Sequence, residues 1–571
     1  VGDYSSGLVV QSIGGGGGQA SLTGFDGLNV TLGASGNSTG DGGDILLSND
    51  GWIGTEGELS HGIFLQSIGG GGGAVFTDLD ASDVTVSLSS DNSGNGGNIS
   101  LEQNGTVFVS GDGSIAVLAQ TLGGGGGIVD RVFADTAGGA GTSGAIDLTL
   151  NGNVIAWGQD GVGVFAQSQG ADGQGDINIS LTEDHIIYAA EDGVALWLSG
   201  GGDNTFTNYG SVFTVDRVLG WAVLGDDGND FIDNHGTILG QIDLGQGENS
   251  FMNNQYMQFI AGPSLSLGAA SNQLINAGSM IIGDSMNAQD TVLTGSFTQT
   301  AMGHTYSELD FGTGVLDNIS MTGTADLNGE VDVSLLNPHL IPFGHFQQTL
   351  FGTEMGAIDN GMVLTTAPSV VITYELLYPN GLDAVLDYNV DFSPNGLSSN
   401  LTEVGDYFNR IQSVGSFPGL ADTVTQLVYD PTMDVYRESL AQLTPDFYGE
   451  HQAELIRSSQ RFTQILASQG GFGSESGLGA SYRGYTAVSA GTAGSGDTGA
   501  SGSGSQGEGY VSATGSDYRY IGESTSFWLQ ADMENSKHQA NGDYKEVDHS
   551  LNRLSMGLNA ILDSSWALGM G

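Results

Sequence analysis

Short apolar runs that end in glycines recur along the first part of the chain. Three of them read GLVVQSIGGGGG, GIFLQSIGGGGG and IAVLAQTLGGGGG. Aligned on their glutamines, four copies are 55, 54 and 47 residues apart (Gln11, Gln66, Gln120 and Gln167). Other runs rich in Val, Ile, Leu and Thr lie between them, separated by Gly, Asn and Asp, and this pattern predicts short β-strands and turns. No helical period is present up to about residue 285, so we expect several strands in each repeat.

A shorter repeat begins near residue 203. The segments NTFTNYGSV, NDFIDNHGTI and NQLINAGSM share an apolar–x–Asn–x–Gly core, and NSFMNNQYM is a degenerate copy. In chain order these four segments start 25, 20 and 23 residues apart, at Asn204, Asn229, Asn249 and Asn272. Periods of this size are typical of solenoids, in which each repeat pairs its strands with the repeats above and below. We therefore predict a mainly β fold with a right-handed parallel β-helix over residues 1–285.

The glycine runs and the repeated asparagines are both expected at the turns of this solenoid. We interpret each run of five glycines as a loop that leaves the stack, where no side chain has to be accommodated. A loop that cradles an anion is the functional alternative, and the acidic surroundings disfavour it. Asparagine suits the corners because it tolerates a left-handed φ and can bond its own backbone.

The pattern changes after residue 285. Residues 286–392 still alternate apolar and polar positions but lack glycine runs and contain bulkier residues, so we expect a β-rich cap on the open end of the solenoid. Residues 393–469 have apolar positions at helical spacing, which predicts a helical linker. Four of the nine arginines fall there, and they either pair with local acids or belong to a helix inside a polar pore (Arg410, Arg437, Arg457 and Arg461).

The last part of the chain combines a loop-like composition with strand-like alternation. Residues 470–525 are rich in Gly, Ser, Thr and Ala, so we expect a flexible loop there. Residues 526–571 alternate apolar with small or polar residues, as in Leu554, Met556 and Leu558, which suits either outer-membrane barrel strands or a soluble hairpin. Two such strands and the start of a third cannot close a barrel, so we expect this part to be unstable as printed and the chain to be a fragment.

The charge balance excludes some classes of partner. The chain has 11 Lys and Arg against 65 Asp and Glu, a net charge of −54, so its surface repels nucleic acid and anionic membranes. The acids either form a solvated surface or bind divalent cations. Cysteine is absent, which excludes disulfides, thiolate metal sites and cysteine nucleophiles and suits passage through an oxidising compartment. No apolar run approaches the roughly 20 residues of a membrane helix.

Residues for catalysis are scarce in the predicted solenoid. Its only bases are Arg131 and Arg217, in unlike contexts, whereas a polysaccharide lyase on such a scaffold needs acids beside Arg or Lys. The sequence GNSTG around Ser38 matches a nucleophile motif but lies in a Gly-rich turn, and that motif needs a strand–turn–helix. We therefore predict no catalytic residue and no enzyme.

Metal and cofactor sites are not predicted either. The segment GDDGNDF from Gly225 is similar to calcium-binding repeats, but it occurs once where such sites need tandem copies, so we interpret it as a corner. The histidines have no paired metal-ligand spacing, and His339 and His345 flank a proline loop and are expected on the surface.

The order of these segments resembles the autotransporters, the type V secreted proteins of Gram-negative bacteria. GSFTQTAMGHTYSELDF and DNISMTGTADLNGEVDVSLL are similar to their autochaperone region. LDYNVDFSPNGLSSNLTEVGDYFNRI is similar to the entry into their helical segment, and LAQLTPDFYGEHQAELIRSSQRF to the stretch before their barrel. SFWLQADM and LNRLSMGLNAILDSSWALGMG are similar to the first barrel strands, and QSIGGGGG to repeats of large passengers.

The resemblance implies a mechanism of self-secretion without catalysis or cofactor. The barrel inserts into the outer membrane with the help of the barrel-assembly machinery and contacts its lipid, and the helix threads the pore. The passenger crosses unfolded and folds outside, the cap folding early. The expected role is an adhesin or aggregation factor at the cell surface, with a host or bacterial surface ligand. The alternative is a stalk for an enzyme or toxin domain N-terminal to this fragment.

Overall fold

The computed structural model is mainly β. It describes residues 2–22, 28–32, 38–77, 84–88, 92–129, 132–134, 140–284, 286–415, 417–444, 452, 455–463, 486–488, 509–522, 525–538, 547–563 and 566–570. The chain forms two compact units, Val1–Val390 with Gly415–Val428, and Asp391–Val414 with Tyr429–Gly571.

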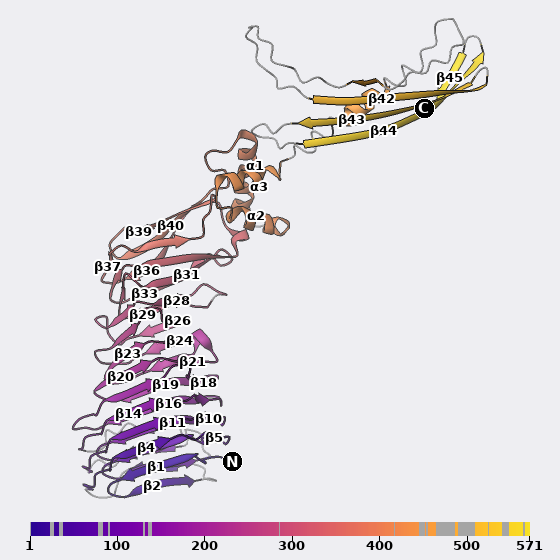
Figure 1. The fold of residues 1–571 in the computed structure, drawn as a ribbon. Coiled ribbons are helices and arrows are strands. Elements are labelled where there is room, and N and C mark those ends of the chain that lie inside the picture. Colours follow the sequence, from indigo (N-terminus) through magenta and orange to yellow (C-terminus); the bar gives the residue numbers. More distant parts are fainter. Residues whose placement is uncertain are drawn as a thin grey trace. The chain divides into compact units, whose positions relative to one another are not determined.

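The first unit contains long parallel sheets, the arrangement of a β-helix or solenoid (Figure 1). Its coils pass through three faces in turn. Face I consists of β4 (Ile45–Asn49), β9 (Ile99–Gln103), β14 (Ile146–Leu150), β17 (Ile177–Leu181), β20 (Asp203–Asn208), β23 (Asn229–Asn234), β25 (Ser250–Asn253), β27 (Gln273–Asn276), β30 (Ser296–Gln299), β34 (Thr324–Leu327) and β37 (Gly356–Asp359). Neighbours in this list pair in parallel.

Two further faces complete each coil, again with parallel pairs. Face II consists of β5 (Ile53–Thr55), β10 (Val107–Val109), β15 (Val154–Ala156), β18 (Ile186–Ala189), β21 (Ser211–Thr214), β24 (Thr237–Asp243), β26 (Gln258–Ser266), β28 (Ser279–Ile282), β31 (His304–Asp310), β35 (Glu330–Leu336) and β38 (Val363–Thr366). Face III consists of β1 (Leu8–Ile13), β6 (Ile63–Ile68), β11 (Ile115–Leu122), β16 (Val162–Gln169), β19 (Val194–Gly200), β22 (Trp221–Leu224), the second halves of β24 and β26, β29 (Asp290–Thr294), β33 (Asn318–Met321) and β36 (Gly344–Thr353).

The sequence repeats set the register of this stack. Gln11, Gln66, Gln120 and Gln167 are direct partners in neighbouring strands, as the sequence alignment predicted. The shorter Asn-containing repeats also supply one coil each, through β20, β23, β25 and β27. Alternate side chains point inward and are fully buried, for example Val107, Val154 and Ile187. The prediction of parallel strands in this part of the chain is confirmed.

The glycine runs do not simply leave the stack as loops, and that interpretation was wrong. The last two glycines of each run begin the strands of a second parallel sheet: β2 (Gly17–Leu22), β7 (Gly72–Thr77) and β12 (Gly126–Val129), with β13 (Val132–Ala134) antiparallel at its edge. Gly73 has a φ of 140°, and a Cβ placed on it would lie 1.8 Å from the carbonyl oxygen of Gly18. These positions therefore require glycine for both their dihedral angle and their packing.

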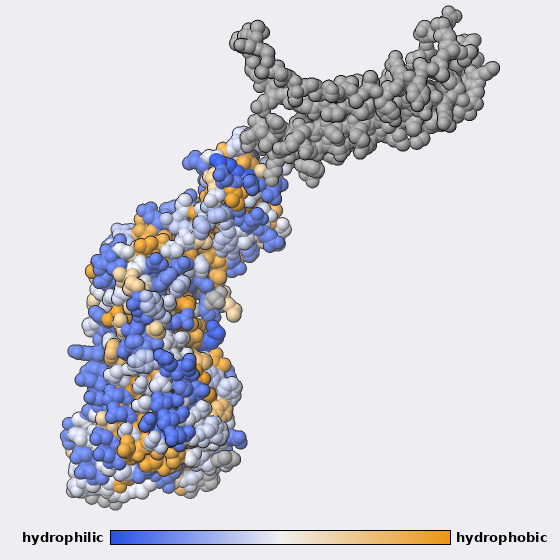
Figure 2. All heavy atoms as spheres, in the orientation of Figure 1, coloured by the Kyte–Doolittle hydropathy of each residue, from blue (hydrophilic) through white to orange (hydrophobic). Residues whose placement is uncertain are grey.

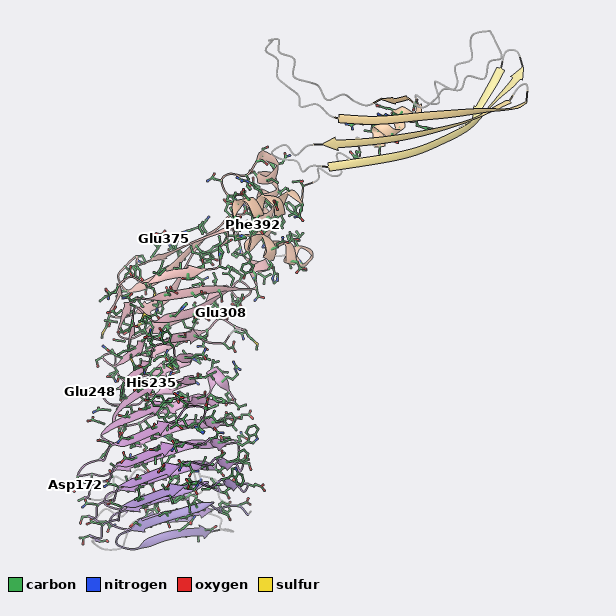
Figure 3. The ribbon with its side chains drawn as sticks, in the orientation of Figure 1. Asp172, His235, Glu248, Glu308, Glu375 and Phe392 are labelled. Atoms are coloured by element: carbon green, nitrogen blue, oxygen red, sulfur yellow. The ribbon has the colours of Figure 1, made fainter. Side chains whose placement is uncertain are left out.

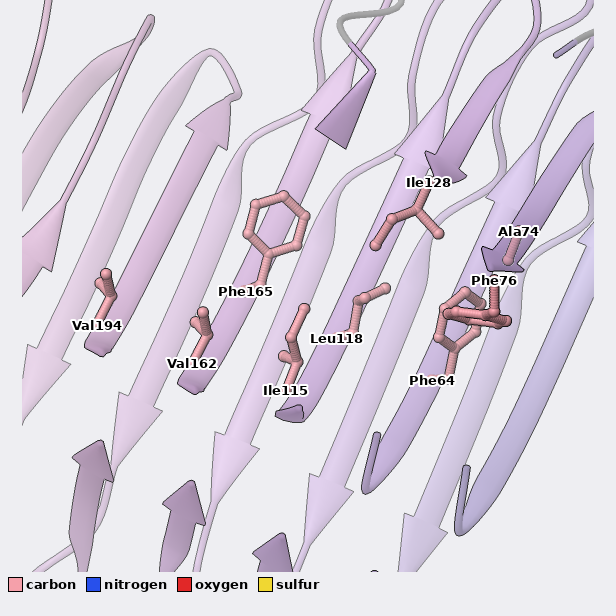
Figure 4. Close-up of a cluster of buried hydrophobic side chains, with 9 residues drawn as sticks. All are labelled: Phe64, Ala74, Phe76, Ile115, Leu118, Ile128, Val162, Phe165 and Val194. Carbon is pink, nitrogen blue, oxygen red and sulfur yellow. The ribbon is translucent and has the colours of Figure 1, made fainter. Parts of the chain in front are cut away.

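This lateral sheet covers part of face III. Phe64, Leu118 and Phe165 share one outward position on β6, β11 and β16, and Ala74, Phe76 and Ile128 from the lateral sheet pack in the same buried cluster (Figure 4). Beyond it, β3 (Leu28–Leu32) pairs in parallel with β8 (Val84–Leu88). The lateral strands thus shield a row of apolar side chains that would otherwise face water.

The stack does not stop at the predicted boundary near residue 285. Parallel pairs continue from β28 to β31, β35 and β38, so residues 286–366 add further coils to the same faces. Within the three faces, antiparallel pairs begin with β32 (Val315–Leu316), and β40 (Asp383–Val390) then pairs with both β36 and β39 (Ile372–Leu377). The missing glycine runs had suggested a separate cap, but coil stacking needs only the apolar alternation, which persists.

Helices lie where helical spacing was predicted. They are α1 (Ser399–Val414), α2 (Ala421–Val428), α3 (Met433–Ala441) and a helical stretch at 455–463, with the 3-10 turn η4 (Pro418–Leu420) directly before α2. Two further 3-10 turns, η2 (Arg217–Leu219) and η3 (Pro338–Leu340), lie in the first unit. In the second unit, the Tyr436 hydroxyl donates to the Phe392 carbonyl (2.5 Å). Arg437 pairs with Asp434 at 3.0 Å, as expected of a surface arginine beside a local acid. Residues 464–469 of the predicted helical linker lie outside the described residues.

The second unit also contains antiparallel strands: β41 (Thr486–Val488), β42 (Gly509–Gly522), β43 (Thr525–His538), β44 (Val547–Asp563) and β45 (Trp566–Met570). The alternating segments after residue 525 are therefore strands, as predicted. The prediction of a loop throughout 470–525 was wrong, because β42 pairs along its length with β43. Its small residues resemble a linker in composition, and composition does not reveal a pairing partner. Among the described helices, none is long and apolar enough to span a membrane.

Candidate functional site

The repeated glutamines form a buried ladder. The Nε2 of Gln11 donates to Gln66 (2.8 Å), that of Gln66 to Gln120 (2.6 Å) and that of Gln120 to Gln167 (2.5 Å). Gln66 also donates to the carbonyl of Gly73 in the glycine run that crosses the ladder. The repeated amides are thus satisfied by one another and hold coils in register.

The repeated asparagines form a second ladder, at the end of face I. Side-chain amides of Asn208, Asn234 and Asn253 each donate to the next coil at 2.8 Å, and Asn276 follows. The Gly210 N–H donates to Asn208 Oδ1, so the predicted bond to the local backbone is present. The predicted left-handed φ was wrong, because none of these asparagines has a positive φ. The amide ladder, rather than the dihedral angle, explains why asparagine recurs.

The catalytic candidates from the sequence do not assemble into a site. Ser38 precedes strand β4 instead of a helix, and its backbone N–H donates to Asn92 Oδ1 (3.1 Å). Arg217 is exposed in η2 at a φ of 55°. Arg131 lies outside the described residues.

The GDDGNDF segment forms a corner with a buried carboxylate. Asp226 accepts hydrogen bonds from Ser199 Oγ (2.7 Å) and from the Gly200 N–H (2.6 Å). Asp230 is 1% exposed and accepts from Asn204, and its Oδ2 has no hydrogen-bond partner. Burial, together with the nearby Asp226 charge, raises the pKa of Asp230 to about 7 despite the Asn204 bond.

A second carboxylate group lies where face II meets the hairpin with β32. Asp317 is fully buried, and it accepts from the backbone N–H groups of Gln289 and Glu308. Burial raises its pKa to about 7, with further repulsion from Glu308 and Asp284. Burial also raises the pKa of Glu308. Across the part of the chain that the structure describes, no cluster of three or more His, Cys, Asp or Glu side chains has a geometry that would hold a metal ion.

The histidines fall into different environments. His345 is exposed and pairs with Asp387 at 2.8 Å, and His339 lies in η3. His61, which no sequence pattern singled out, is fully buried against Phe64 and Phe76, with ring centroids 5.9 and 5.5 Å away. Its Nδ1 accepts from the Ile115 N–H (3.0 Å), and burial lowers its pKa to about 4. This histidine is therefore a neutral core residue.

An uninterrupted apolar row on the outer side of face II is the most unusual surface feature. The row consists of one outward side chain from each of eight successive coils: Phe108, Ile155, Tyr188, Phe213, Leu239, Ile260, Ile281 and Tyr306. The residues on either side of each are buried, so these side chains face outward, although Tyr188, packed against Trp157 and Phe213, is only 9% exposed. In an exposed strand such alternate positions are normally polar.

Further aromatic residues extend this apolar row. The coil that precedes Phe108 in the stack has Gly54 at the row position. The ring of Trp52 lies over Gly54, because a Cβ placed on Gly54 would be 1.9 Å from that ring. Trp157, 58% exposed, packs 5.6 Å from Tyr188, which in turn lies 5.4 Å from Phe213 (centroid distances). The sequence contained part of the signal, because VFV and VIA are apolar throughout, and SMII is apolar after its first residue, where a half-exposed strand would alternate.

The other exposed surfaces differ in character. The outward positions of face I carry Asp147, Thr149, Asn178 and Ser180. Acidic side chains such as Asp172 and Glu248 project at the periphery of the stack (Figure 3). The side shown in Figure 2 mixes hydrophilic residues with smaller hydrophobic patches. No family model and no curated protein matches this chain.

Proposed function

We propose that this chain is part of a self-secreted bacterial surface protein of the autotransporter type, whose stacked part is displayed outside the cell as an adhesin. The order of parts carries the proposal: long in-register parallel sheets, then helices α1 to α3, then long antiparallel strands β42 to β45. In this proposal the stack is a right-handed β-helix, residues 286–392 act as its autochaperone, the helical linker threads the pore, and residues 526–571 begin the barrel.

Physical features of the stack support display of this kind. Each coil pairs with its neighbours, so folding can proceed coil by coil from one end as the chain emerges. The absence of cysteine removes accidental cross-links in an oxidising compartment. The high negative charge keeps a long displayed surface soluble.

Surface labelling of intact cells tests the proposal. An epitope tag is inserted after exposed Asp172 in the complete gene, which is expressed in a Gram-negative host. We expect antibody to label intact cells, and a matched deletion of residues 509–570 to abolish labelling while tagged protein is still made. A periplasmic marker controls for leaky outer membranes. Equal labelling without residues 509–570, or no labelling with them present, would refute the proposal.

A further inference from the structure

We infer that the apolar row of face II binds a linear, uncharged polysaccharide lying along the stack axis. This inference deepens the proposed function, because it names the class of ligand that the displayed surface would recognise. It depends on four observations: the length of the row, its width, its polar border and its charge.

The dimensions of the row fit a thin, extended ligand. Nine coils from Trp52 to Tyr306 contribute to it, and at ~4.8 Å per strand the row is about 38 Å long. Each coil contributes one apolar side chain at the row position, so the row is about one side chain wide, roughly 10 Å, and offers about 400 Å². A stable protein interface needs about 800 Å² from each partner. A second copy of this chain or a globular partner is therefore disfavoured.

The border of the row supplies neutral hydrogen-bonding groups. Two residues before the row position, successive coils carry partly exposed Ser211, Thr237, Gln258 and Ser279. Sugar rings have apolar C–H faces that pack on aromatic rings and hydroxyl groups at their edges, so one chain could use both the row and its border. An extended peptide along the axis would cross the strands at right angles, and their backbone groups are already paired, so β-augmentation is not available to it.

The charge of the row selects against ionic polymers. Strands β5, β10, β15, β18, β21 and β28 contain no Asp, Glu, Lys or Arg. Asp216 lies near Tyr188, where its charge adds to burial in raising the pKa of that tyrosine. With a net charge of −54 on the whole chain, an anionic polysaccharide would be repelled. A neutral polysaccharide is not repelled by the acidic protein, and it has no charges that binding would leave unpaired.

Affinity electrophoresis of the full chain tests this inference directly. Native gels contain hydroxyethylcellulose, galactomannan or, as the anionic control, polygalacturonate. We expect at least one neutral polymer to retard the protein and polygalacturonate not to do so. The variant Trp157→Ala/Phe213→Ser should lose at least about tenfold in affinity, because two ring contacts are removed. Tyr306→Ser, at the other end of the row, should weaken binding less.

The matched control is Phe231→Ser. Phe231 is an aromatic residue on face I, outside the row, and it is 40% exposed. This variant should bind as the unaltered chain does, and circular dichroism should show that all variants are folded. The inference is overturned if no neutral polymer retards the chain, if polygalacturonate retards it equally, or if the row variants bind normally. Row-dependent dimers in sedimentation would overturn it in favour of a second copy. Because the assay uses purified protein, its result is independent of secretion.

Discussion

At the scale of single residues, Asp230 occupies a position where the coils on both sides carry asparagine. It pairs with Asn204 in one direction, and its backbone N–H donates to Asn249 in the other. Its pKa is raised to about 7, so the folded state holds a proton there that the unfolded chain releases near 4. The stabilisation from this proton is complete below about pH 4 and is lost as the pH rises through 7.

Asp230→Asn should therefore stabilise the protein at alkaline pH. At pH 8 the substitution removes a buried charge, and we expect the free energy of unfolding to rise by about 1–3 kcal/mol. At pH 5 the gain should nearly vanish, because the native carboxyl group is already protonated. Thermal unfolding at both pH values measures this, with exposed Glu248→Gln as the control. A gain that is independent of pH would contradict the assignment.

His61 should have the opposite pH dependence. Burial lowers its pKa from about 6.5 to about 4, so the unfolded chain takes up a proton in that interval and the folded chain does not. Stability should fall as the pH drops from 6.5 to 4, by about 1.4 kcal/mol per pH unit from this group. His61→Gln keeps an acceptor for the Ile115 N–H but cannot be protonated. Its unfolding temperature should decline less steeply over this range, and an unchanged slope would exclude His61 as the cause.

At the scale of elements, the glutamine ladder explains why sequence analysis found the register. The same residues that align the repeats also bond across the coils, so their spacing reports the coil length directly. The lateral strands were missed because glycine-rich runs resemble loops, and the mirror-image φ that admits them to a sheet is not visible in a sequence. The apolar row was missed because most of its strands, such as β10, β15 and β21, are three or four residues long, too short to show alternation.

Gln120→Leu should weaken this ladder measurably. The substitution leaves the amides of Gln66 and Gln167 without one partner each in a buried site. We expect a loss of about 1–3 kcal/mol in the free energy of unfolding, measured by denaturant titration. Gln273→Leu, at an exposed outward position of β27, should change it by less than about 0.5 kcal/mol. Equal effects would mean that the ladder adds no stability.

Two glycines of the runs separate the cost of lost close packing from the cost of backbone dihedral strain. Gly73 and Gly16 both have a positive φ, 140° and 101°, but a Cβ on Gly16 would have open space around it. Gly16→Ala should cost about 1 kcal/mol from its dihedral angle alone. Gly73→Ala should cost clearly more and loosen β7, which proteolysis near residues 72–77 would detect. Equal costs would show that close packing between the runs is not required.

At the scale of the whole molecule, the first unit satisfies its backbone between neighbouring coils. Stability in such a stack is approximately a sum over adjacent pairs, and each face repeats one chemistry along its length. Face I carries polar side chains outward on β9, β14, β17 and β20, face III is partly covered by its lateral sheet, and face II keeps an apolar row. The proposed binding function therefore depends on the apolar row that distinguishes face II from the other faces, and not on a single cluster of residues.

Cross-linking of introduced cysteines tests the parallel, in-register stack most directly, because the chain has no cysteine of its own. Thr149 and Ser180 are direct partners on face I, as are Ser180 and Thr207. Their Cα atoms should lie about 5 Å apart, within the range for a disulfide. The control pair is Thr149→Cys/Asn178→Cys, shifted by two residues. We expect disulfides in both in-register pairs, found by thiol titration and mass spectrometry, and free thiols in the control. Free thiols in the in-register pairs, or equal oxidation of the control, would contradict the stack.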